Sequence, residues 1–343
     1  MQTFAQRLIA WQRRHGRHDL PWQNTRDPYR VWLAEIMLQQ TQVATVIPYY
    51  LRFIARFPGI IELAAAHPDA VMALWSGLGY YARARNLHRC ARQLVENHRG
   101  AFPRDPAAIA RLPGIGRSTA NAIAAVCFGA RAPILDGNVK RVLCRHFGIE
   151  GYPGAAPIEA RLWQIAEQLL PPQHVATYLQ AQMDLGALVC TRSQPRCATC
   201  PVSATCVALH EGRTATLPTP RPRRALPQRQ VSLLVLLHVD RVALERRPPA
   251  GVWGGLWSLP ELPAGRDAAH FARDELGLKL RAVQPAPSLD HDFTHFRLHI
   301  QPLICGVADF AATTESRLHW FERNAFAELA LPAPIRKILN AIP

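Results

Sequence analysis

The sequence predicts a multi-domain protein, with an all-α domain over residues 1–214 and a small α+β domain over residues 230–343. In the first part, apolar residues recur at the spacing of amphipathic helices. Residues 215–229 are rich in proline and arginine and interrupt this pattern as a linker would. Beyond them, continuous or alternating apolar runs indicate strands. With 343 residues, 49% of them apolar, the chain is long enough to bury a core in each part.

The net charge of the chain and its N-terminal segment indicate which kinds of partner the protein has. The formal net charge of +15 favours nucleic acid, although arginines spread over a generally basic surface would give the same value. Residues 1–22 have helical apolar spacing, with Phe4, Leu8 and Trp11 on one face, and lack the core of a signal peptide. No apolar run approaches the roughly 20 residues of a bilayer span. We therefore expect a cytoplasmic protein with no membrane partner.

A tight turn between two helices lies near the middle of the all-α part. Residues 112–120 read LPGIGRSTA, and the two helices and turn together span about residues 106–128. Gly114 and Gly116 would let the backbone come close to a ligand, and the N–H groups at the second helix would suit a phosphate. An ordinary helix–helix hairpin without a ligand has the same pattern.

One carboxylate interrupts an apolar helix near the N-terminus. Asp27 and Pro28 predict the start of a helix whose residues 31–38 are apolar except for Glu35. Glu35 either faces solvent or is held inside, where desolvation would raise its pKa into the range of a general acid. The spacing leaves both readings open. Gln40, which follows, could hydrogen-bond a base edge or belong to a plain helix surface.

A second carboxylate precedes another helix. Asp136 stands just before a predicted helix over residues 138–147, so we expect it to cap that helix. Hydrogen bonds from backbone N–H groups would lower its pKa and keep it charged. The pKa values of Glu35 and Asp136 would then be pushed apart, as in a catalytic acid paired with an anion.

Residues 77–81 read GLGYY and are followed by Arg83 and Arg85. Glycines, tyrosines and arginines together suit a wedge and clamp on a nucleic-acid strand, but also the packed start of a helix.

Four of the eight cysteines fall within 17 residues, at the spacing Cys190-x6-Cys197-x2-Cys200-x5-Cys206. Such a density without an export signal favours a metal centre over disulfides. The centre is either tetrahedral zinc or a [4Fe–4S] cluster, and the single Cys-x2-Cys pair with longer outer gaps favours the cluster. The remaining four cysteines stand singly in apolar surroundings and fit buried packing positions.

The last third predicts an α+β domain. Its expected elements are strands over residues 231–237 and 241–246, a loop over 252–260, a helix over 267–276, strands over 293–307 and a closing helix over 333–342.

These motifs resemble a known family. The turn at residues 112–120, the downstream Asp136 and the four-cysteine loop are similar to the endonuclease III superfamily of DNA glycosylases, which have a helix-hairpin-helix fold. Residues 35–42 (EIMLQQTQ), 77–81 and 136–141 (DGNVKR) resemble its MutY-type adenine DNA glycosylases. That family removes adenine mispaired with 8-oxoguanine or guanine and carries a [4Fe–4S] cluster and a Nudix-like module that reads 8-oxoguanine. The resemblance covers nearly the whole chain and implies a monomer acting on double-stranded DNA.

The resemblance also implies residue roles. Protonated Glu35 would donate to adenine N7, ionised Asp136 would stabilise an oxocarbenium-like sugar, and Asn138 would orient the Asp136 region. The implied DNA contacts are Ser118 and Gln180 at the adenine, Gln40 and Tyr80 at the base stack, Gly114, Gly116 and Lys140 at phosphates, and Phe293, Thr294 and His295 at 8-oxoguanine, with Leu78 as a further DNA-contacting residue. A structural cluster on Cys190, Cys197, Cys200 and Cys206 would present Arg192 and Arg196 to DNA.

Three positions refine this reading. Lyase members of the superfamily have a nucleophilic lysine where this chain has Ser118, which implies a monofunctional enzyme that uses water, although Lys140 could give weak side chemistry. Thr294 replaces the serine usual in the family's reading loop. Only fragments of a Nudix metal box remain at residues 273–278, so we expect the second domain to bind and not to hydrolyse. The rival readings are a thymine-glycol lyase, and a non-catalytic iron–sulfur DNA-binding protein with Glu35 on the surface.

Overall fold

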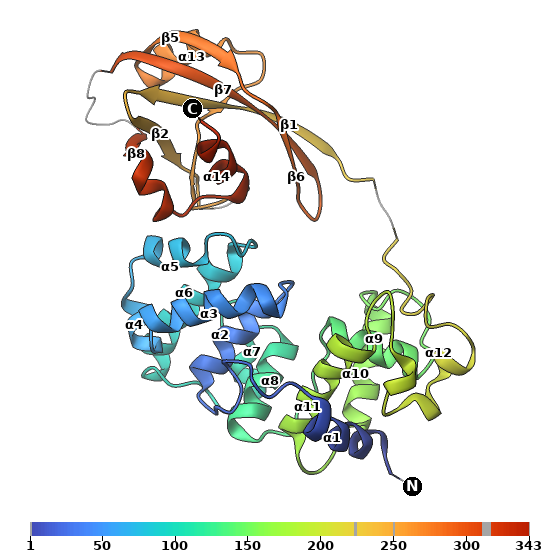
Figure 1. The fold of residues 1–343 in the computed structure, drawn as a ribbon. Coiled ribbons are helices and arrows are strands. Elements are labelled where there is room, and N and C mark those ends of the chain that lie inside the picture. The colour runs from blue at the N-terminus through green and yellow to red at the C-terminus, as the bar shows by residue number, and fades with distance from the viewer. Residues whose placement is uncertain (1, 223–224, 250, 311–316, 343) are drawn as a thin grey trace. The chain divides into compact units, whose positions relative to one another are not determined.

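The computed structural model describes residues 2–222, 225–249, 251–310 and 317–342. By their contacts, Met1–Ala65 and Asn86–Arg223 form one compact unit, and Ala66–Arg85 and Arg224–Pro343 form a second (Figure 1). The sequence analysis assigned residues 66–85 to the first domain, whereas here they group with the second unit. Arg223 and Arg224 of the predicted linker lie outside the described residues.

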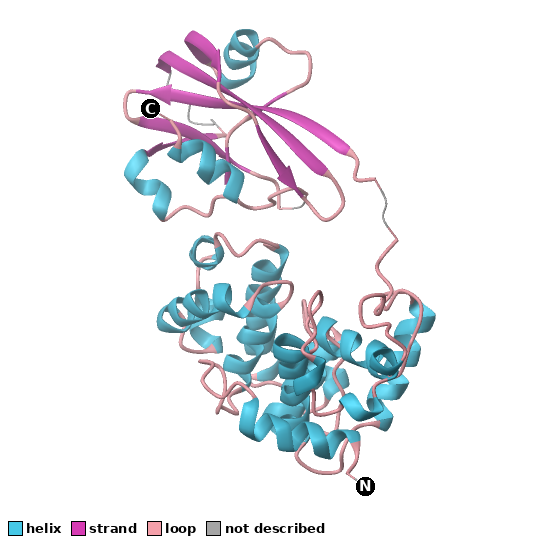
Figure 2. Cartoon of the chain, turned by 45° about the vertical axis from the view of Figure 1, so that its right-hand side comes forward, coloured by secondary structure: helices cyan, strands magenta, loops and turns pink. Residues whose placement is uncertain are grey.

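The described part of the first unit consists of helices and loops (Figure 2). Its elements are α1 (Phe4–His15), α2 (Pro28–Leu38), α3 (Val43–Arg56), α4 (Ile60–Ala65), most of α6 (Ala82–His98), α7 (Pro106–Ala110), α8 (Arg117–Phe128), α9 (Gly137–His146), α10 (Ala156–Gln168), α11 (Val175–Asp184), the π-helix η1 (Leu185–Val189), the short 3-10 helices η2 (Cys197–Thr199) and η3 (Ser203–Thr205), and α12 (Val207–His210). None of the described helices in either unit combines the length and the apolar character that a membrane crossing requires.

Local capping starts the helices that carry the predicted site. Asp27 accepts a hydrogen bond from the Tyr29 amide at 3.0 Å, and Pro28 occupies the first turn of α2, as predicted. Gly116 begins α8, and Asp136 begins α9. The hairpin α7–α8 and the two capped helices were therefore predictable from short stretches of sequence.

A core in the first unit positions α8, α9 and α11. Buried residues of α1, α8, α9 and α11 pack together with Leu162 and Ala166 of α10. Val139, Leu143 and Tyr178 are among its most buried members. Burial of this apolar surface stabilises the helices on which Asp136 and Asn138 stand.

The second unit is built on a mixed sheet in the order β3-β2-β1-β7-β5, with β4 pairing with β1, β6 with β7 and β8 with β2. β1 and β7 run parallel, and the other pairs are antiparallel. The strands are β1 (Gln228–His238), β2 (Arg241–Arg246), β3 (Trp257–Ser258), β4 (Glu261–Leu262), β5 (Leu278–Pro285), β6 (Leu289–Asp292), β7 (Arg297–Phe310) and β8 (Leu318–Glu322). The described helices are α5 (Pro68–Trp75), the start of α6, α13 (Ala268–Leu276), the 3-10 helix η4 (Arg323–Ala327) and α14 (Ala333–Asn340).

Most predicted elements of this unit are confirmed, with one correction. Residues 293–296 were expected in a strand, but they form the loop between β6 and β7, closed by a hydrogen bond from the Phe293 amide to the Phe296 carbonyl at 2.8 Å. The Phe293 ring stacks on the Phe296 ring, with centroids 4.4 Å apart. The side-chain pattern there reflects this aromatic packing rather than a strand face.

Candidate active site and nucleic-acid interface

Glu35 lies in the middle of α2 and keeps only part of its surface accessible. Burial, followed by the negative charge of Asp136, raises the pKa of Glu35 to about 7. The fully solvent-facing reading of Glu35 is therefore wrong. A carboxyl with this pKa is partly protonated at neutral pH and can act as a general acid.

Asp136 caps α9 as predicted. Its Oδ1 accepts the Val139 amide at 2.8 Å, and its Oδ2 accepts Nδ2 of Asn138 at 3.2 Å. Its pKa, however, is raised above the ordinary value because burial outweighs these hydrogen bonds and the charge of Arg141. The expected lowering of the pKa is wrong. The hydrogen bonds still favour the carboxylate form of Asp136, whereas both causes acting on Glu35 favour its protonated form.

Arg141 connects Asn138 to the segment that leads to the first cysteine. Its Nη2 donates to Oδ1 of Asn138 at 2.9 Å and to the Gly186 carbonyl at 2.7 Å, and its Nε donates to the Cys190 carbonyl at 2.8 Å. A Cβ at Gly186 would lie only 2.5 Å from Cβ of Asn138, so the π-helix η1 can pass α9 this closely only with glycine. Asn138 is thus held between Asp136 and Arg141.

The hairpin α7–α8 is joined to Asp136 by Ser118. The Ser118 hydroxyl accepts the amide of Leu135 at 3.0 Å, one residue before Asp136. Gly114 has a left-handed φ of 76°, and Gly114 and Gly116 are both exposed. The turn therefore leaves its backbone accessible, as phosphate binding at a helix N-terminus requires.

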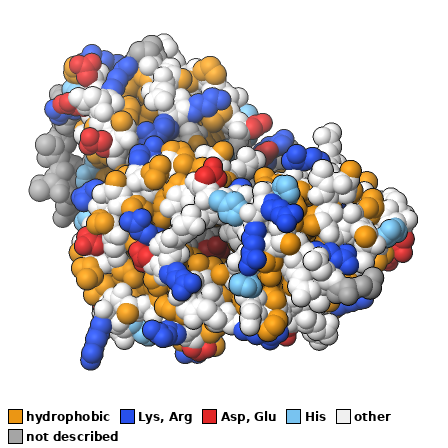
Figure 3. Space-filling view, turned by 60° about the horizontal axis from the view of Figure 1, so that its bottom comes forward, with side chains coloured by type: hydrophobic (Ala, Val, Ile, Leu, Met, Phe, Trp, Pro, Cys, Tyr) orange, Lys and Arg blue, Asp and Glu red, His pale blue; other side chains and the backbone are white. Residues whose placement is uncertain are grey.

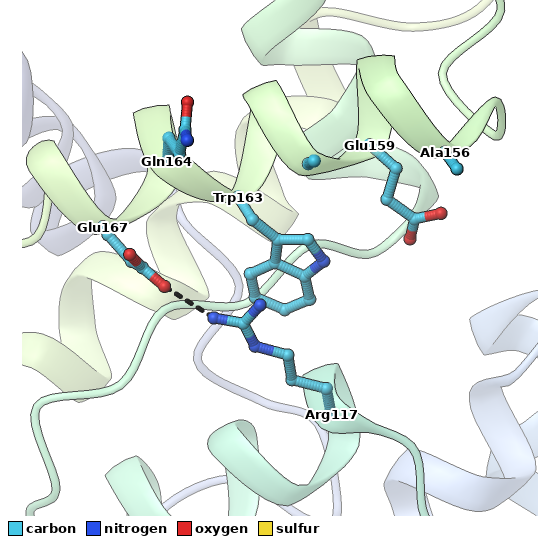
Figure 4. Close-up of a pocket in the computed structure, with 7 residues that line it drawn as sticks. Arg117, Ala156, Glu159, Trp163, Gln164 and Glu167 are labelled. Carbon is cyan, nitrogen blue, oxygen red and sulfur yellow. Dashed lines mark hydrogen bonds and ion pairs between the residues drawn. The ribbon is translucent and has the colours of Figure 1, made fainter.

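Two cations beside this hairpin are paired with carboxylates of α10. The guanidinium of Arg117 lies 3.9 Å from the centroid of the Trp163 ring and 2.5 Å from Glu167, in a pocket of about 450 Å³ (Figure 4). Nζ of Lys140 lies 2.9 Å from Oε1 of Glu159. Arg117 and Lys140 are therefore held in place without DNA, and a phosphate would compete with these carboxylates.

The four predicted cysteine ligands line one small cavity of about 30 Å³, together with Arg145. Among the described residues, no group of three or more His, Cys, Asp or Glu side chains is close enough to hold a single metal ion. Tetrahedral zinc needs sulfur atoms about 2.3 Å from one point. The four thiols line one common space, the arrangement in which a [4Fe–4S] cluster binds each of four thiolates to a different iron.

Arg145 is a residue that the sequence analysis missed. Its side chain is buried and donates to the carbonyls of Leu217, Thr191 and Arg192 and to Sγ of Cys190 at 3.4 Å. Arg141 and Arg145 are four residues apart on α9, so both face the cysteine loop. This spacing was the available signal, but it is shared by many surface arginine pairs.

Lys and Arg side chains are spread over the face drawn in Figure 3, among apolar side chains, and do not gather in one patch. On this face, positive charge is thus distributed, which suits contact with a long polyanion.

Comparison with known proteins identifies the family. A model described as "HhH-GPD superfamily base excision DNA repair protein" matches residues 33–168, and a NUDIX domain model matches residues 232–341. An adenine DNA glycosylase of Buchnera aphidicola subsp. Acyrthosiphon pisum is 35% identical over 98% of this chain and 97% of its own length. The chain belongs to the adenine DNA glycosylase family. Mouse and human adenine DNA glycosylases are each 32% identical over 98% of this chain, which covers 77% and 73% of their lengths.

Solved structures are similar in fold to part of this chain. A thermostable thymine-DNA glycosylase, 29% identical, matches 61% of this chain and 95% of its own with a TM-score of 0.56. A trapped endonuclease III–DNA covalent intermediate, 22% identical, shares the fold over 60% of this chain with a TM-score of 0.52. The predicted helix-hairpin-helix glycosylase fold, the Nudix-like domain and the assignment as a DNA glycosylase are therefore confirmed.

In this chain, Gln40 is exposed and has a left-handed φ of 57°. Gln180 is partly buried, and its Nε2 donates to Oδ1 of Asp184 at 2.9 Å. Asp184 is fully buried and also pairs with Arg17 at 2.7 Å, so it orients Gln180. The sequence analysis missed Asp184, which has no local signature in a helix.

The remaining residues that were predicted to contact DNA lie in the second unit. Tyr80 is 48% exposed, with a left-handed φ of 50°, whereas the side chain of Leu78 is buried. Leu78 was expected to contact DNA, and its side chain is only 5% exposed. Thr294 and His295 are exposed at the β6–β7 loop, and the Thr294 hydroxyl lies 3.3 Å from Nδ1 of His295.

Proposed function

We propose that this protein hydrolyses the N-glycosidic bond of adenine mispaired with 8-oxoguanine or guanine in double-stranded DNA. The observation that carries the proposal is the Glu35–Asp136 pair, in which a carboxyl with a pKa of about 7 lies within the electrostatic reach of a second carboxyl. The adenine DNA glycosylases that match nearly the whole chain support adenine in DNA as the base that is removed.

The two carboxyls have different tasks. Adenine must leave the base stack to reach a buried acid, at a cost of a few kcal/mol. Protonated Glu35 then donates its proton to N7 of adenine, which makes the base a better leaving group. The sugar gains positive charge as the bond breaks, and the Asp136 carboxylate stabilises that charge. Asn138 and the Val139 amide hold the carboxylate in a fixed orientation.

The residues beside this pair favour a monofunctional reaction with water. Ser118 stands at the lyase position and is engaged with the Leu135 amide. Lys140 is paired with Glu159, and an ammonium held in this way is not free to form a Schiff base. The nucleophile in the proposal is therefore water, and strand cleavage should need added alkali.

A [4Fe–4S] cluster fits the cysteine loop. Cys190, Cys197, Cys200 and Cys206 would hold it, and when bound it would cross-link the loop and stabilise its fold. Arg141 and Arg145 join that loop to α9, the helix that Asp136 caps. We assign Arg192 and Arg196 of the loop to DNA phosphates.

DNA recognition is divided between the two units. In the first, the Gly114–Gly116 turn and Lys140 would contact phosphates, Gln40 would enter the base stack, and Gln180 would contact adenine. In the second, Tyr80 would enter the stack, and Thr294 with its neighbours Phe293 and His295 would contact 8-oxoguanine. Their exposure supports this assignment for Gln40, Tyr80, Thr294 and His295.

Single-turnover excision of adenine from an A:8-oxoguanine duplex tests the proposal. Glu35→Gln should lower the rate by at least about 100-fold with DNA affinity nearly unchanged, because it removes the proton but keeps the shape. Asp136→Asn should also abolish turnover and leave binding intact. Glu96→Gln, an exposed carboxylate of α6, is the matched control. Near wild-type excision by Glu35→Gln, or cleavage of the strand without alkali, would contradict the mechanism.

A further inference from the structure

The second unit contains two surface loops with proposed DNA contacts. The wedge loop comprises residues 76–81 and carries Tyr80, and the reading loop comprises residues 293–296 and carries Thr294. They are more than 200 residues apart in the sequence, yet both belong to the same compact unit. Hydrogen bonds attach the wedge loop and the residues after it to other segments of this unit, and one of those segments contacts the reading loop.

The backbone of the wedge loop adopts left-handed conformations, one of them at a residue that is not glycine. Gly77 and Gly79 have left-handed φ values of 101° and 70°, and Tyr80, which is not glycine, has a φ of 50°. A left-handed backbone is unfavourable for a tyrosine and persists only where the surroundings determine it. Tyr80 is 48% exposed and its ring centroid lies 5.4 Å from the Arg83 guanidinium, so support for this backbone conformation must come from the residues around it.

Part of that support is local. Nε1 of Trp75 donates to the Gly79 carbonyl at 3.2 Å. The buried guanidinium of Arg83 donates to the carbonyls of Leu78 and Gly79, each at 3.2 Å. These bonds determine the shape of the turn, but they do not attach it to the sheet.

The attachment runs through one carbonyl beside α14. The Leu331 carbonyl accepts the Ser76 hydroxyl at 2.9 Å and the Tyr81 hydroxyl at 3.2 Å. Ser76 and Tyr81 are the two ends of the wedge loop, so a single acceptor holds both. Leu331 is itself buried, and the neighbouring Ala330 carbonyl accepts the Trp257 amide of β3 at 3.0 Å.

Arg336 of α14 strengthens this attachment. Its Nη1 donates to the Phe326 carbonyl at 2.9 Å, and its Nη2 donates to the Leu329 carbonyl at 2.9 Å and to the Ser76 hydroxyl at 3.2 Å. One planar guanidinium therefore orders the segment that precedes α14 and contacts the wedge loop at the same time.

Arg85 makes a second attachment, close to the reading loop. Its Nη1 donates to the Gly254 carbonyl at 2.7 Å. The ring of Trp253, the preceding residue, lies 6.0 Å from the ring of Phe293 in the reading loop. In the first turn of α5, Asp69 forms an ion pair with Arg246 of β2.

We propose that Arg336 and Arg85 are positioning residues that hold the Tyr80 wedge loop in a fixed relation to the reading loop. Neither needs to touch DNA. The inference rests on the proposed function in so far as Tyr80 enters the base stack. Its consequence is that the C-terminal domain contributes to excision twice, through the lesion contacts and through the conformation of the wedge loop.

Hydrogen exchange of the DNA-free, full-length protein tests the attachment without any activity. Arg336→Gln should speed exchange of the amides of residues 77–81 by about tenfold, a loss expected for one charge-assisted hydrogen bond. Lys337→Gln, the exposed neighbour on α14, should leave exchange unchanged. Ser76→Ala is the second variant, because it removes the shared hydroxyl without disturbing the Arg336 bonds to Phe326 and Leu329. Unchanged exchange in both Arg336→Gln and Ser76→Ala would overturn the inference.

A double-mutant cycle then tests the role in catalysis. Arg336→Gln should slow single-turnover excision by about tenfold in the wild-type background and have little further effect in the Tyr80→Ala background, because both changes disable the same contact. Equal, additive losses in the two backgrounds would show that Arg336 does not act through Tyr80. Failure of the proposed function gives a different result, in which the wild-type protein does not excise adenine while the exchange difference persists.

Discussion

The guanidinium of Arg145 lies 3.4 Å from Sγ of Cys190 and is buried beside it. The same side chain donates to the carbonyls of Thr191 and Arg192 within the cysteine loop and to the Leu217 carbonyl beyond it. Arg145 thus attaches the cysteine loop to α9, and it does so by donating hydrogen bonds to backbone carbonyls of that loop.

Replacing Arg145 by Met should destabilise the first unit by about 3 kcal/mol, because it leaves buried carbonyls without donors. Urea unfolding measures this change. Arg192→Ala is the control, since its side chain is exposed and only its carbonyl contacts Arg145. Equal stability of the two variants would mean that water replaces the Arg145 hydrogen bonds.

Cys200→Ser should remove iron and acid-labile sulfide from the purified protein and weaken its binding to DNA, since four thiolates close the proposed cluster site. Cys127→Ala, outside the loop, should retain both. Iron and sulfide analysis, with absorbance near roughly 400 nm for thiolate–iron charge transfer, measures the outcome. A colourless wild-type protein with one zinc ion would contradict the cluster.

The pH dependence of excision should follow the protonation of Glu35. Its pKa of about 7 means that the protonated fraction, and with it the single-turnover rate, falls tenfold per pH unit above neutrality. The residual rate of Glu35→Gln should lack this alkaline limb. An alkaline limb that survives in Glu35→Gln would assign the acid to another group.

Stability should depend on the same group with a definite sign. The folded-state pKa of Glu35, about 7, lies above its ordinary value of 4.5, so the folded protein holds this proton more tightly than the unfolded chain. The resulting stabilisation is present in full below about pH 4.5 and is lost as the pH rises to about 7. Relative to wild type, Glu35→Gln should therefore gain up to about 3 kcal/mol of stability between these limits. Urea titrations at pH 4.5 and pH 8 compare the two, and a pH-independent difference would argue against a buried carboxyl.

Thr294 should contribute to preference for the lesion rather than to chemistry. Thr294→Ala removes an exposed hydroxyl and should reduce the excision ratio of A:8-oxoguanine to A:G by roughly threefold to tenfold, the worth of one hydrogen bond. Thr294→Ser keeps the hydroxyl and should preserve the ratio. If both variants behave like wild type, the reading loop does not use this hydroxyl.

Local signals in the sequence predicted much of the candidate site. The caps at Asp27 and Asp136 and the turn at Gly114 and Gly116 depend on a few neighbouring residues, so short stretches determine them. The family resemblance predicted the fold and the paired carboxyls for the same reason, because each motif that carries it is one unbroken stretch of the sequence. Arg145 and Asp184 were not predicted, because their hydrogen bonds to residues 191, 192 and 217 and to Arg17 join segments that are distant in the sequence.

By itself, the sequence determined which helices start at Asp27 and Asp136, where the hairpin turns and that four thiols converge on one loop. Only the tertiary structure decided the pKa values of Glu35 and Asp136 and the compact unit to which residues 66–85 belong. Packing around Glu35 and Asp136 sets their desolvation, and the raised pKa of Asp136 shows that burial outweighs its cap. Residues 66–85 likewise join the second unit through bonds to Leu331 and Gly254, partners more than 160 residues away. Desolvation and long-range hydrogen bonds depend on the surroundings in space, which no local pattern of residues encodes.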